Sequence, residues 1–165
     1  MVRLGSLTRI GRGLYASSAG TGVTANHDLA LVAIRMPKAV VCLLSALRFH
    51  RIGTQNPAEV WVAIDAKARK PQSDVPPTRV VRFSGHGLTV DIEQHTIEGI
   101  TVSITSPAKT VADCFKYRNK IGLDVALEAL REYRRSRRPL DELLRAAQAV
   151  RVARVMRPYL EALTT

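Results

Sequence analysis

The sequence predicts an α+β fold in which a small mixed β-sheet with a β-hairpin packs against a helical C-terminal half. Residues 60–105 hold short apolar runs, continuous or alternating with polar residues, which are typical of strands. From residue 106 onward the apolar residues recur at helical spacing instead. Because strands and helices fall in separate blocks there, one sheet with helices packed on it fits this order.

The composition supports one folded domain, or one domain with a short appendage, in a chain of 165 residues. Apolar residues make up 46% and aromatic residues only 5%, so the core must be built from aliphatic side chains. This balance excludes a disordered chain, a collagen-like repeat and a coiled coil as the whole molecule. Two cysteines, Cys42 and Cys114, are too few for a disulfide scaffold, and their apolar surroundings predict buried, inert thiols.

Membrane and export signals are missing from the sequence pattern. No apolar run approaches the ~20 residues that a membrane span needs. The residues after Met1 include no apolar signal-peptide region. We therefore expect a cytoplasmic protein without a membrane partner.

The first fifty residues predict two helices after an irregular start. Glycines within 7–15 favour a short hairpin, and the small residues of 16–24 favour a loop. The spacing of apolar residues predicts a helix over 26–36, which a proline ends. The apolar stretch 39–50 predicts a buried segment that leads into a short helix over 43–49.

The middle of the chain predicts the sheet. Residues 60–64 form a continuous apolar run, as in a strand buried on both faces. The charges and three prolines that follow predict an exposed loop, and residues 79–83 predict another short strand. The clearest signal is a hairpin that turns at Glu98-Gly99, with strands over 90–97 and 100–105.

The last sixty residues predict a series of helices. Ser106 as N-cap and Pro107 at the first helical position mark the start of one helix. Two more are predicted over 123–135 and 141–150, and Pro158 is expected to break or kink the last segment. The residues expected to face the core are Val111, Ala112, Phe115, Ala126, Leu130, Tyr133, Leu143, Leu144, Ala147 and Val150.

The charge indicates a polyanionic partner. Lysine and arginine together number 25 against 14 acids, a formal net charge of +11, and 19 of the cations are arginine. The planar arginine side chain can contact phosphate through two nitrogens at once, which lysine cannot. Residues 116–157 alone hold 12 cations and five acids. This distribution predicts contact with nucleic acid, and DNA is the expected partner.

The arginines of this segment recur at helical spacing in two groups. The first group is Arg131, Arg134, Arg135 and Arg138, and the second is Arg151, Arg154 and Arg157. If the helix over 123–135 runs on to residue 138, the first group forms one basic stripe. A solvated face with ion pairs inside the helix is the alternative interpretation.

Two further arginines, Arg9 and Arg12, flank the glycines of the hairpin over 7–15, as in a basic two-stranded wing. The residues predicted to contact nucleic acid are therefore Arg9, Arg12, Arg131, Arg134, Arg135, Arg138, Arg151 and Arg154.

The pattern for catalysis is incomplete. Asp65 and Lys67 follow a predicted strand, as in the second half of a metal-dependent nuclease site, but the carboxylate of the first half is missing. The four histidines lack the spacing of metal ligands. Asp113 is expected to pair with Lys109 on the polar side of its helix. We predict no catalytic residue, metal or cofactor, and keep two alternatives: a nuclease that uses Asp65 and Lys67, and a basic module that binds a protein partner.

Six stretches of the chain follow one another in the order found in a known family. The longest is TSPAKTVADCFKYR, and GLDVALEAL follows three residues later. In chain order the stretches are 9–15, 37–47, 60–64, 80–85, 105–118 and 122–130. On their joint order and spacing, the chain resembles over nearly its whole length the AbiEi family of antitoxins and transcriptional regulators from type IV toxin–antitoxin systems.

The resemblance implies a non-enzymatic function. Family members carry an N-terminal winged helix-turn-helix that binds operator repeats, and a C-terminal domain that counters a nucleotidyltransferase-like toxin without a stable complex. The stretch over 9–15 resembles the tip and last strand of the wing, and no recognition helix precedes it. We therefore expect a remnant of the wing over 1–16 and the AbiEi-like C-terminal antitoxin domain over 17–165.

Overall fold

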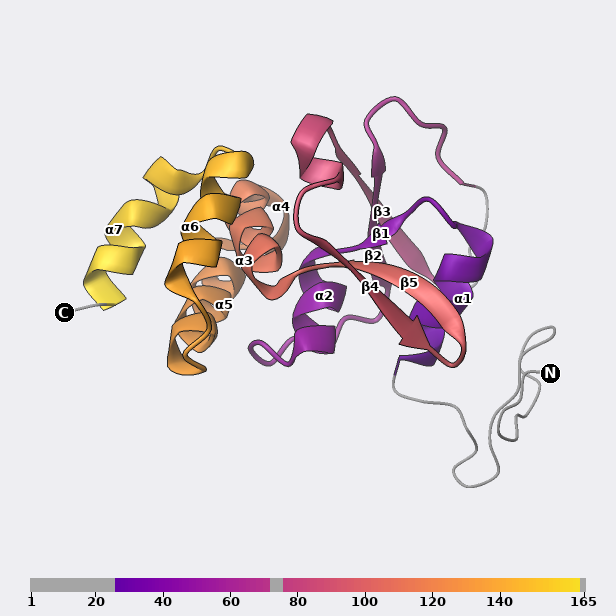
Figure 1. The fold of residues 1–165 in the computed structure, drawn as a ribbon, viewed down its shortest axis with the longest axis horizontal. Helices are drawn as coiled ribbons and strands as arrows, with labels where there is room; N and C mark the ends of the chain where they lie inside the picture. The colour runs from indigo at the N-terminus through magenta and orange to yellow at the C-terminus, as the bar shows by residue number, and fades with distance from the viewer. Residues whose placement is uncertain (1–25, 72–75, 164–165) are drawn as a thin grey trace, which may run out of the picture.

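The computed structural model describes residues 26–71 and 76–163, which form seven α-helices and a five-stranded mixed sheet. The predicted α+β class, with a helical C-terminal half, is therefore confirmed. Figure 1 shows the sheet with α1 on one side of the molecule and the C-terminal helices on the other. The hairpin expected over 7–15, the loop over 16–24, and both Arg9 and Arg12 lie outside the described residues.

The sheet has the strand order β3-β2-β1-β5-β4. Its strands are β1 (Val40–Val41), β2 (Val60–Asp65), β3 (Thr78–Phe83), β4 (Ile92–Ile97) and β5 (Ile100–Thr105). The short strand β1 pairs antiparallel with β2 and parallel with β5, so it joins the two halves of the sheet. The hairpin β4–β5 turns at Glu98 and Gly99 as predicted, and both residues have positive φ, as the tight hairpin turns require.

Strand β2 is buried on both faces, which explains its continuous apolar sequence. Because side chains alternate along a strand, Trp61 and Ala63 join one core while Val60 and Val62 join another. The core that contains Val60 and Val62 is closed by α1 (His27–Arg35). The opposite core is closed by α2 (Leu43–His50) and by the C-terminal helices.

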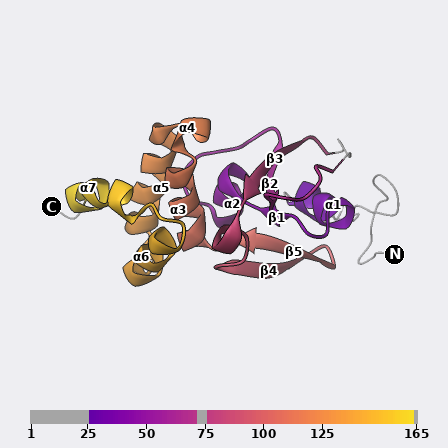
Figure 2. The same ribbon diagram turned by 90° about the horizontal axis from the view of Figure 1, so that it is seen from above.

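The C-terminal helices are α3 (Pro107–Lys116), α4 (Arg118–Ile121), α5 (Leu123–Arg135), α6 (Leu140–Ala149) and α7 (Ala153–Leu163). Helix α3 begins as predicted, because the Ser106 hydroxyl accepts a hydrogen bond from the Lys109 backbone N–H at 3.1 Å. It contacts α2, α5 and α6, and Figure 2 shows it between the sheet and the outer helices. Its residues 108–115 are all buried, so α3 is surrounded by other elements along most of its length.

Two expectations about the outer helices need correction, namely the burial of Leu144 and a break of the chain at Pro158. Leu144 was expected in the core, but 41% of its surface is exposed. The inward face of α6 is instead formed by Leu143, Ala146 and Ala147, which share one side of the helix. Pro158 does not break the last segment, because α7 continues through it. A proline in a helix interior removes one backbone hydrogen bond, and the rest of α7 tolerates that loss.

Candidate functional site

The first arginine group does not form the single helical stripe that its spacing allowed. Helix α5 ends at Arg135, and Arg137 turns the chain with φ 60°, so Arg138 lies beyond the helix. Arg131 and Arg135 are exposed, and Arg135 forms an ion pair with Glu132 at 2.7 Å. The stripe on α5 therefore contains only three arginines, and Arg138 lies in the turn that follows the helix.

Arg134 and Arg138 are half-buried. The guanidinium of Arg138 donates to the His50 backbone carbonyl at 3.3 Å, near the C-terminal end of α2. Carbonyl groups at a helix C-terminus favour nearby cations, so Arg138 also has a structural role. Within the described residues, Nε of Arg134 and Nε of Arg138 are buried without a hydrogen-bond partner. Both side chains thus keep unused donor capacity.

The second arginine group lies at the other end of α6. Arg151 turns the chain between α6 and α7 with φ 64°, and Arg154 lies in the first turn of α7. Both side chains are exposed. Because α6 has ten residues, roughly 15 Å of helix separates this turn from the turn that holds Arg138. The structure brings the two groups onto neighbouring helices, since α5 contacts α7, but not into one continuous stripe.

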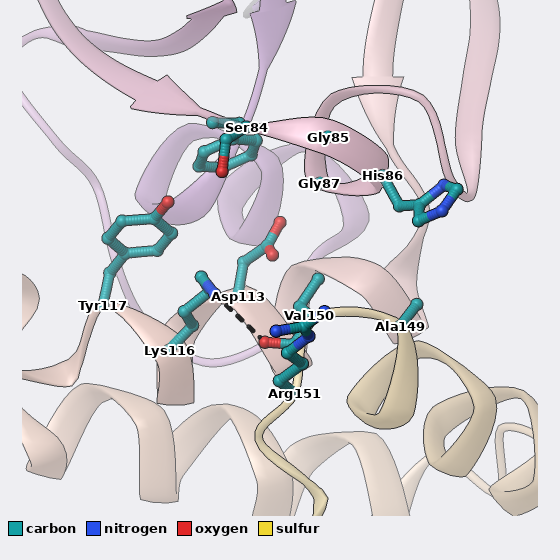
Figure 3. A pocket seen from close by; sticks show the side chains of 11 residues that line it. Ser84, Gly85, His86, Gly87, Asp113, Lys116, Tyr117, Ala149, Val150 and Arg151 are labelled. Carbon is teal, nitrogen blue, oxygen red and sulfur yellow. Dashed lines mark hydrogen bonds between the residues drawn. The ribbon is translucent and has the colours of Figure 1, made fainter. Parts of the chain in front are cut away.

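A cavity of about 280 Å³ lies beside α3, and the sequence analysis did not predict it. Figure 3 shows its lining, which comes from three separate parts of the chain. The 3₁₀ turn η1 (Gly85–Leu88) covers one side, the C-terminal end of α3 forms the base, and the turn after α6 closes the remaining side. Arg151 lies on this last side, so the cavity touches the second arginine group.

The base of the cavity holds a buried ion pair. Lys109 Nζ donates to Asp113 Oδ2 at 2.6 Å, and the two side chains are 0% and 1% exposed. The expected pairing of Lys109 with Asp113 is confirmed, but the expected position on a polar helix side is wrong. The reason is that α2, α5 and α6 pack around α3 and bury residues 108–115.

The environment of Asp113 shifts its acidity. Burial raises the pKa of this carboxyl from 3.8 to about 6, and the ammonium groups of Lys109 and Lys116 oppose that rise. Lys109 also lies 4.6 Å from the centre of the Phe83 ring, on its face. Its cation is therefore stabilised by both a carboxylate and an aromatic ring.

The wall of the cavity is aromatic and its rim is cationic. Tyr117 stacks on Phe83 with 5.2 Å between ring centres and 18° between planes. Burial raises the pKa of the Tyr117 hydroxyl to about 12, so this group stays a donor, and it donates to the Arg82 carbonyl at 3.2 Å. Lys116 Nζ donates to the Val150 carbonyl at 3.1 Å. The cavity thus combines an acceptor, an aromatic face and cations.

Both cysteines are buried in the core, as predicted. Burial raises the pKa of each thiol well above its usual value, and the negative charge of Asp113 adds to the shift. A thiol that stays protonated is a poor nucleophile, which agrees with the inert role expected for Cys42 and Cys114.

The pair Asp65 and Lys67 lies at an exposed end of β2. Asp65 Oδ1 accepts a hydrogen bond from the Lys67 backbone N–H at 2.8 Å, which is a local turn contact. Asp28 and Glu59 line a depression at the opposite end of this six-residue strand, roughly 17 Å away. Within 26–71 and 76–163, no group of three or more His, Cys, Asp or Glu side chains is placed to hold a metal ion.

The chain has no recognised match among known families or curated proteins, and its described helices are short. No protein-family model matches the chain, and a search of curated proteins finds no significant match. None of the helices in the described residues is both long and apolar enough to cross a membrane.

Proposed function

We propose that the chain is a non-enzymatic antitoxin and transcriptional regulator of a bacterial type IV toxin–antitoxin (abortive infection) system. In this role it contacts DNA through the basic surface of its helical half. It counters a nucleotidyltransferase-like toxin in the cytoplasm without forming a stable complex with it. The resemblance of six ordered stretches to the AbiEi family supports the biological context.

The observation that carries the DNA contact is uncompensated positive charge on the C-terminal helices. Residues 116–157 hold seven more cations than acids. Among ion pairs between described residues, this segment contributes only Arg135 with Glu132 and Arg145 with Asp141. Exposed arginines at both ends of α6 are therefore available to phosphate groups.

The experiment is DNA binding by the full chain at several salt concentrations. The probe is a labelled duplex of the gene's own promoter, with random DNA as competitor. We expect replacement of four exposed arginines (R131Q, R135Q, R151Q and R154Q) to weaken binding. It should also reduce the slope of log K against log salt by about 0.9 for each arginine that contacts a phosphate.

A matched control removes the same charge elsewhere. Arg35, Lys38, Lys67 and Arg69 are exposed, and they lie at the end of α1, just after it, and in the loop after β2, away from the C-terminal helices (Figure 1). Their replacement by Gln lowers the net charge equally. DNA binding that is insensitive to the four arginine substitutions would rule out this surface. Equal loss in both variants would show attraction by total charge, without a defined interface.

The two alternatives give different results in the same assay. A basic module that binds an acidic protein would show no preference for the promoter over random DNA. Its DNA affinity would depend only on its net charge, so the two sets of Gln substitutions would weaken binding equally. A nuclease would cleave the duplex after addition of Mg²⁺ or Mn²⁺, and Asp65→Ala would abolish the cleavage.

A further inference from the structure

A second cavity, here named the α1 cavity, lies where α1 ends and β1 begins. Its volume is about 440 Å³, which is within the range of small-molecule sites. Its lining comes from the turn after α1, from the end of β2 with the loop that follows, and from Leu88 of η1. Figure 1 shows the first two of these segments away from the C-terminal helices. The α1 cavity shares no lining residue with the cavity beside α3.

The α1 cavity lies at the carboxyl ends of two parallel strands. Strands β2 and β3 pair in parallel and end side by side, with Asp65 opposite Phe83. The last two residues of β2, Ile64 and Asp65, line the cavity, and η1 follows β3. The carboxyl ends of parallel strands are a frequent position for ligand sites, because the chain leaves the sheet there in loops. This position favours a binding site.

The loop after β2 is held in place by Arg82. Its guanidinium donates to three backbone carbonyls, and the shortest contact is 2.6 Å to Ala68. The other two acceptors are the carbonyls of Asp65 and Ala66, at 3.4 and 3.2 Å. The opposite wall contains Pro37, whose ring fixes its backbone φ. Both walls are therefore ordered before a ligand arrives, which lowers the entropy that binding must overcome.

The interior of the α1 cavity is aliphatic. Of its eleven lining residues seven are apolar, and none is aromatic. Met36 and Ile64 are buried, so they form the base, while Ala39 and Ala68 have small side chains that leave the space open. A nucleobase finds no ring to stack on in this lining. An aliphatic chain is the molecular shape that the space fits.

The opening of the α1 cavity is cationic. Arg35, Lys38 and Arg69 line it and are exposed, and none of them forms an ion pair with another described residue. The acid at the opening is Asp65, which accepts a hydrogen bond from the Lys67 backbone N–H at 2.8 Å. Three cations against one acid leave two positive charges in excess, which attract an anionic head group.

We propose that the α1 cavity binds a medium-chain aliphatic carboxylate, with the hydrocarbon chain against Met36 and Ile64 and the carboxylate at the three cations of the opening. Burial of the chain supplies most of the affinity, about fourfold for each CH₂ group removed from water. The cations select the head group: a carboxylate is attracted, an alcohol is not, and an ammonium is repelled. An inorganic anion would leave the aliphatic interior unfilled.

Calorimetric titration of the full chain at pH 8 tests the choice of head group. The ligands are decanoate, decanol and decyltrimethylammonium, which share one chain length. We expect decanoate to bind about tenfold more tightly than decanol, because three exposed cations each contribute a small attraction. Decyltrimethylammonium should bind more weakly than decanol. Absence of decanoate binding, or decanol binding as tight as that of decanoate, would overturn the proposal.

A second titration series varies the chain at a constant head group. The ligands are hexanoate, octanoate and decanoate. We expect the affinity to rise by about fourfold for each added CH₂ group, as burial of apolar surface requires. An affinity that does not change with chain length would mean that only the charge is recognised, and the proposal would fail.

Two tryptophan variants locate the ligand. Ala68→Trp should fill the α1 cavity and abolish decanoate binding. Ala66→Trp changes an exposed residue of the same loop outside the cavity lining, so it should leave binding unchanged. Circular dichroism checks that both variants keep the fold. Decanoate binding that persists in a folded Ala68→Trp protein would place the ligand elsewhere and refute the proposal.

Charge variants test the opening. Replacement of its cations (R35Q, K38Q and R69Q) should reduce decanoate affinity to that of decanol. The matched control R131Q, R135Q and R154Q removes the same charge from the C-terminal helices and should leave decanoate binding unchanged. An equal loss in both variants would show attraction by total charge and contradict a defined site.

Vesicles of phosphatidylglycerol separate a free carboxylate from a membrane lipid. Co-sedimentation of the full chain with these vesicles should be the same for the wild type and for Ala68→Trp. Vesicle binding that Ala68→Trp abolishes would assign the α1 cavity to membrane lipid and overturn the proposal.

Failure here is distinguishable from failure of the DNA-binding function, because the two surfaces have no residue in common. The variant R35Q, K38Q and R69Q should lose decanoate affinity and keep its preference for the promoter. The variant R131Q, R135Q and R154Q should show the reverse. Each function is therefore tested in a protein that retains the residues of the other.

Discussion

Lys109 and Asp113 show how a single pair of residues depends on its surroundings. Their spacing of four residues on α3 makes the pairing predictable from sequence. Their complete burial is not, because the same spacing on an outer helix gives an exposed pair such as Asp141 with Arg145. The difference arises from elements distant in sequence that enclose α3, and no local pattern encodes it.

We expect Lys109→Met to destabilise the protein by about 3–5 kcal/mol, because it leaves the Asp113 carboxylate buried without its partner. Guanidinium unfolding at pH 8 measures the change. The double variant Lys109→Met with Asp113→Leu should recover most of the loss, since apolar side chains of similar size often replace a buried pair at little cost. A double variant as unstable as the single one would contradict this account.

The raised pKa of Asp113 predicts a pH-dependent stability. The folded-state pKa of about 6 exceeds the ordinary value of 3.8, so between these values the folded state binds more protons than the unfolded state. Its contribution is therefore complete below pH 4 and is lost as the pH rises through 6. We expect the free energy of unfolding of the wild type, relative to Asp113→Asn, to fall by about 3 kcal/mol from pH 4 to pH 7.

Denaturant titrations of both proteins across this pH range provide the measurement. Other groups titrate alike in the two proteins, so the difference isolates Asp113. A difference that does not change with pH would mean that the carboxyl titrates normally.

At the scale of elements, the start of α3 was the most predictable feature. Ser106 and Pro107 are the residue types that begin helices, and the hydroxyl of Ser106 makes the expected contact. We expect Ser106→Ala to cost about 1 kcal/mol of stability, and Ser106→Asp to retain most of it, because aspartate also accepts the N–H hydrogen bond. Thermal unfolding of the two variants tests this, and an equal loss in both would refute the capping role.

Most helices and strands were predicted because their patterns are local. The helix predicted over 123–135 matches α5, and the hairpin turned at the predicted residues. The residues of β1 were predicted only to be buried and not to form a strand. A strand of two residues is too short to show an alternation of apolar and polar residues. Leu144 was misplaced because two consecutive leucines leave the helical phase ambiguous, and packing against α3 selected Leu143.

At the scale of the whole molecule, the cavity is the feature that sequence reasoning missed. Gly85-His86-Gly87 was visible in the sequence but lacks the pattern of a phosphate loop. The η1 turn, the end of α3 and the turn after α6 are each about thirty residues apart and meet only in the folded chain. The sequence predicted that the two arginine groups are strongly basic. It did not predict that α6 separates them, because this depends on where α5 and α6 end in the structure.

The position of β1 has a consequence for how the chain acquires its fold. Val41 pairs with Ile104, 63 residues later in the sequence, and this parallel contact joins the two halves of the sheet. A chain leaving the ribosome therefore exposes one edge of β1 until β5 has been synthesised. Such a long-range closure is slow compared with hairpin formation, so we expect it to limit the folding rate and to leave β1 open to mispairing in the nascent protein.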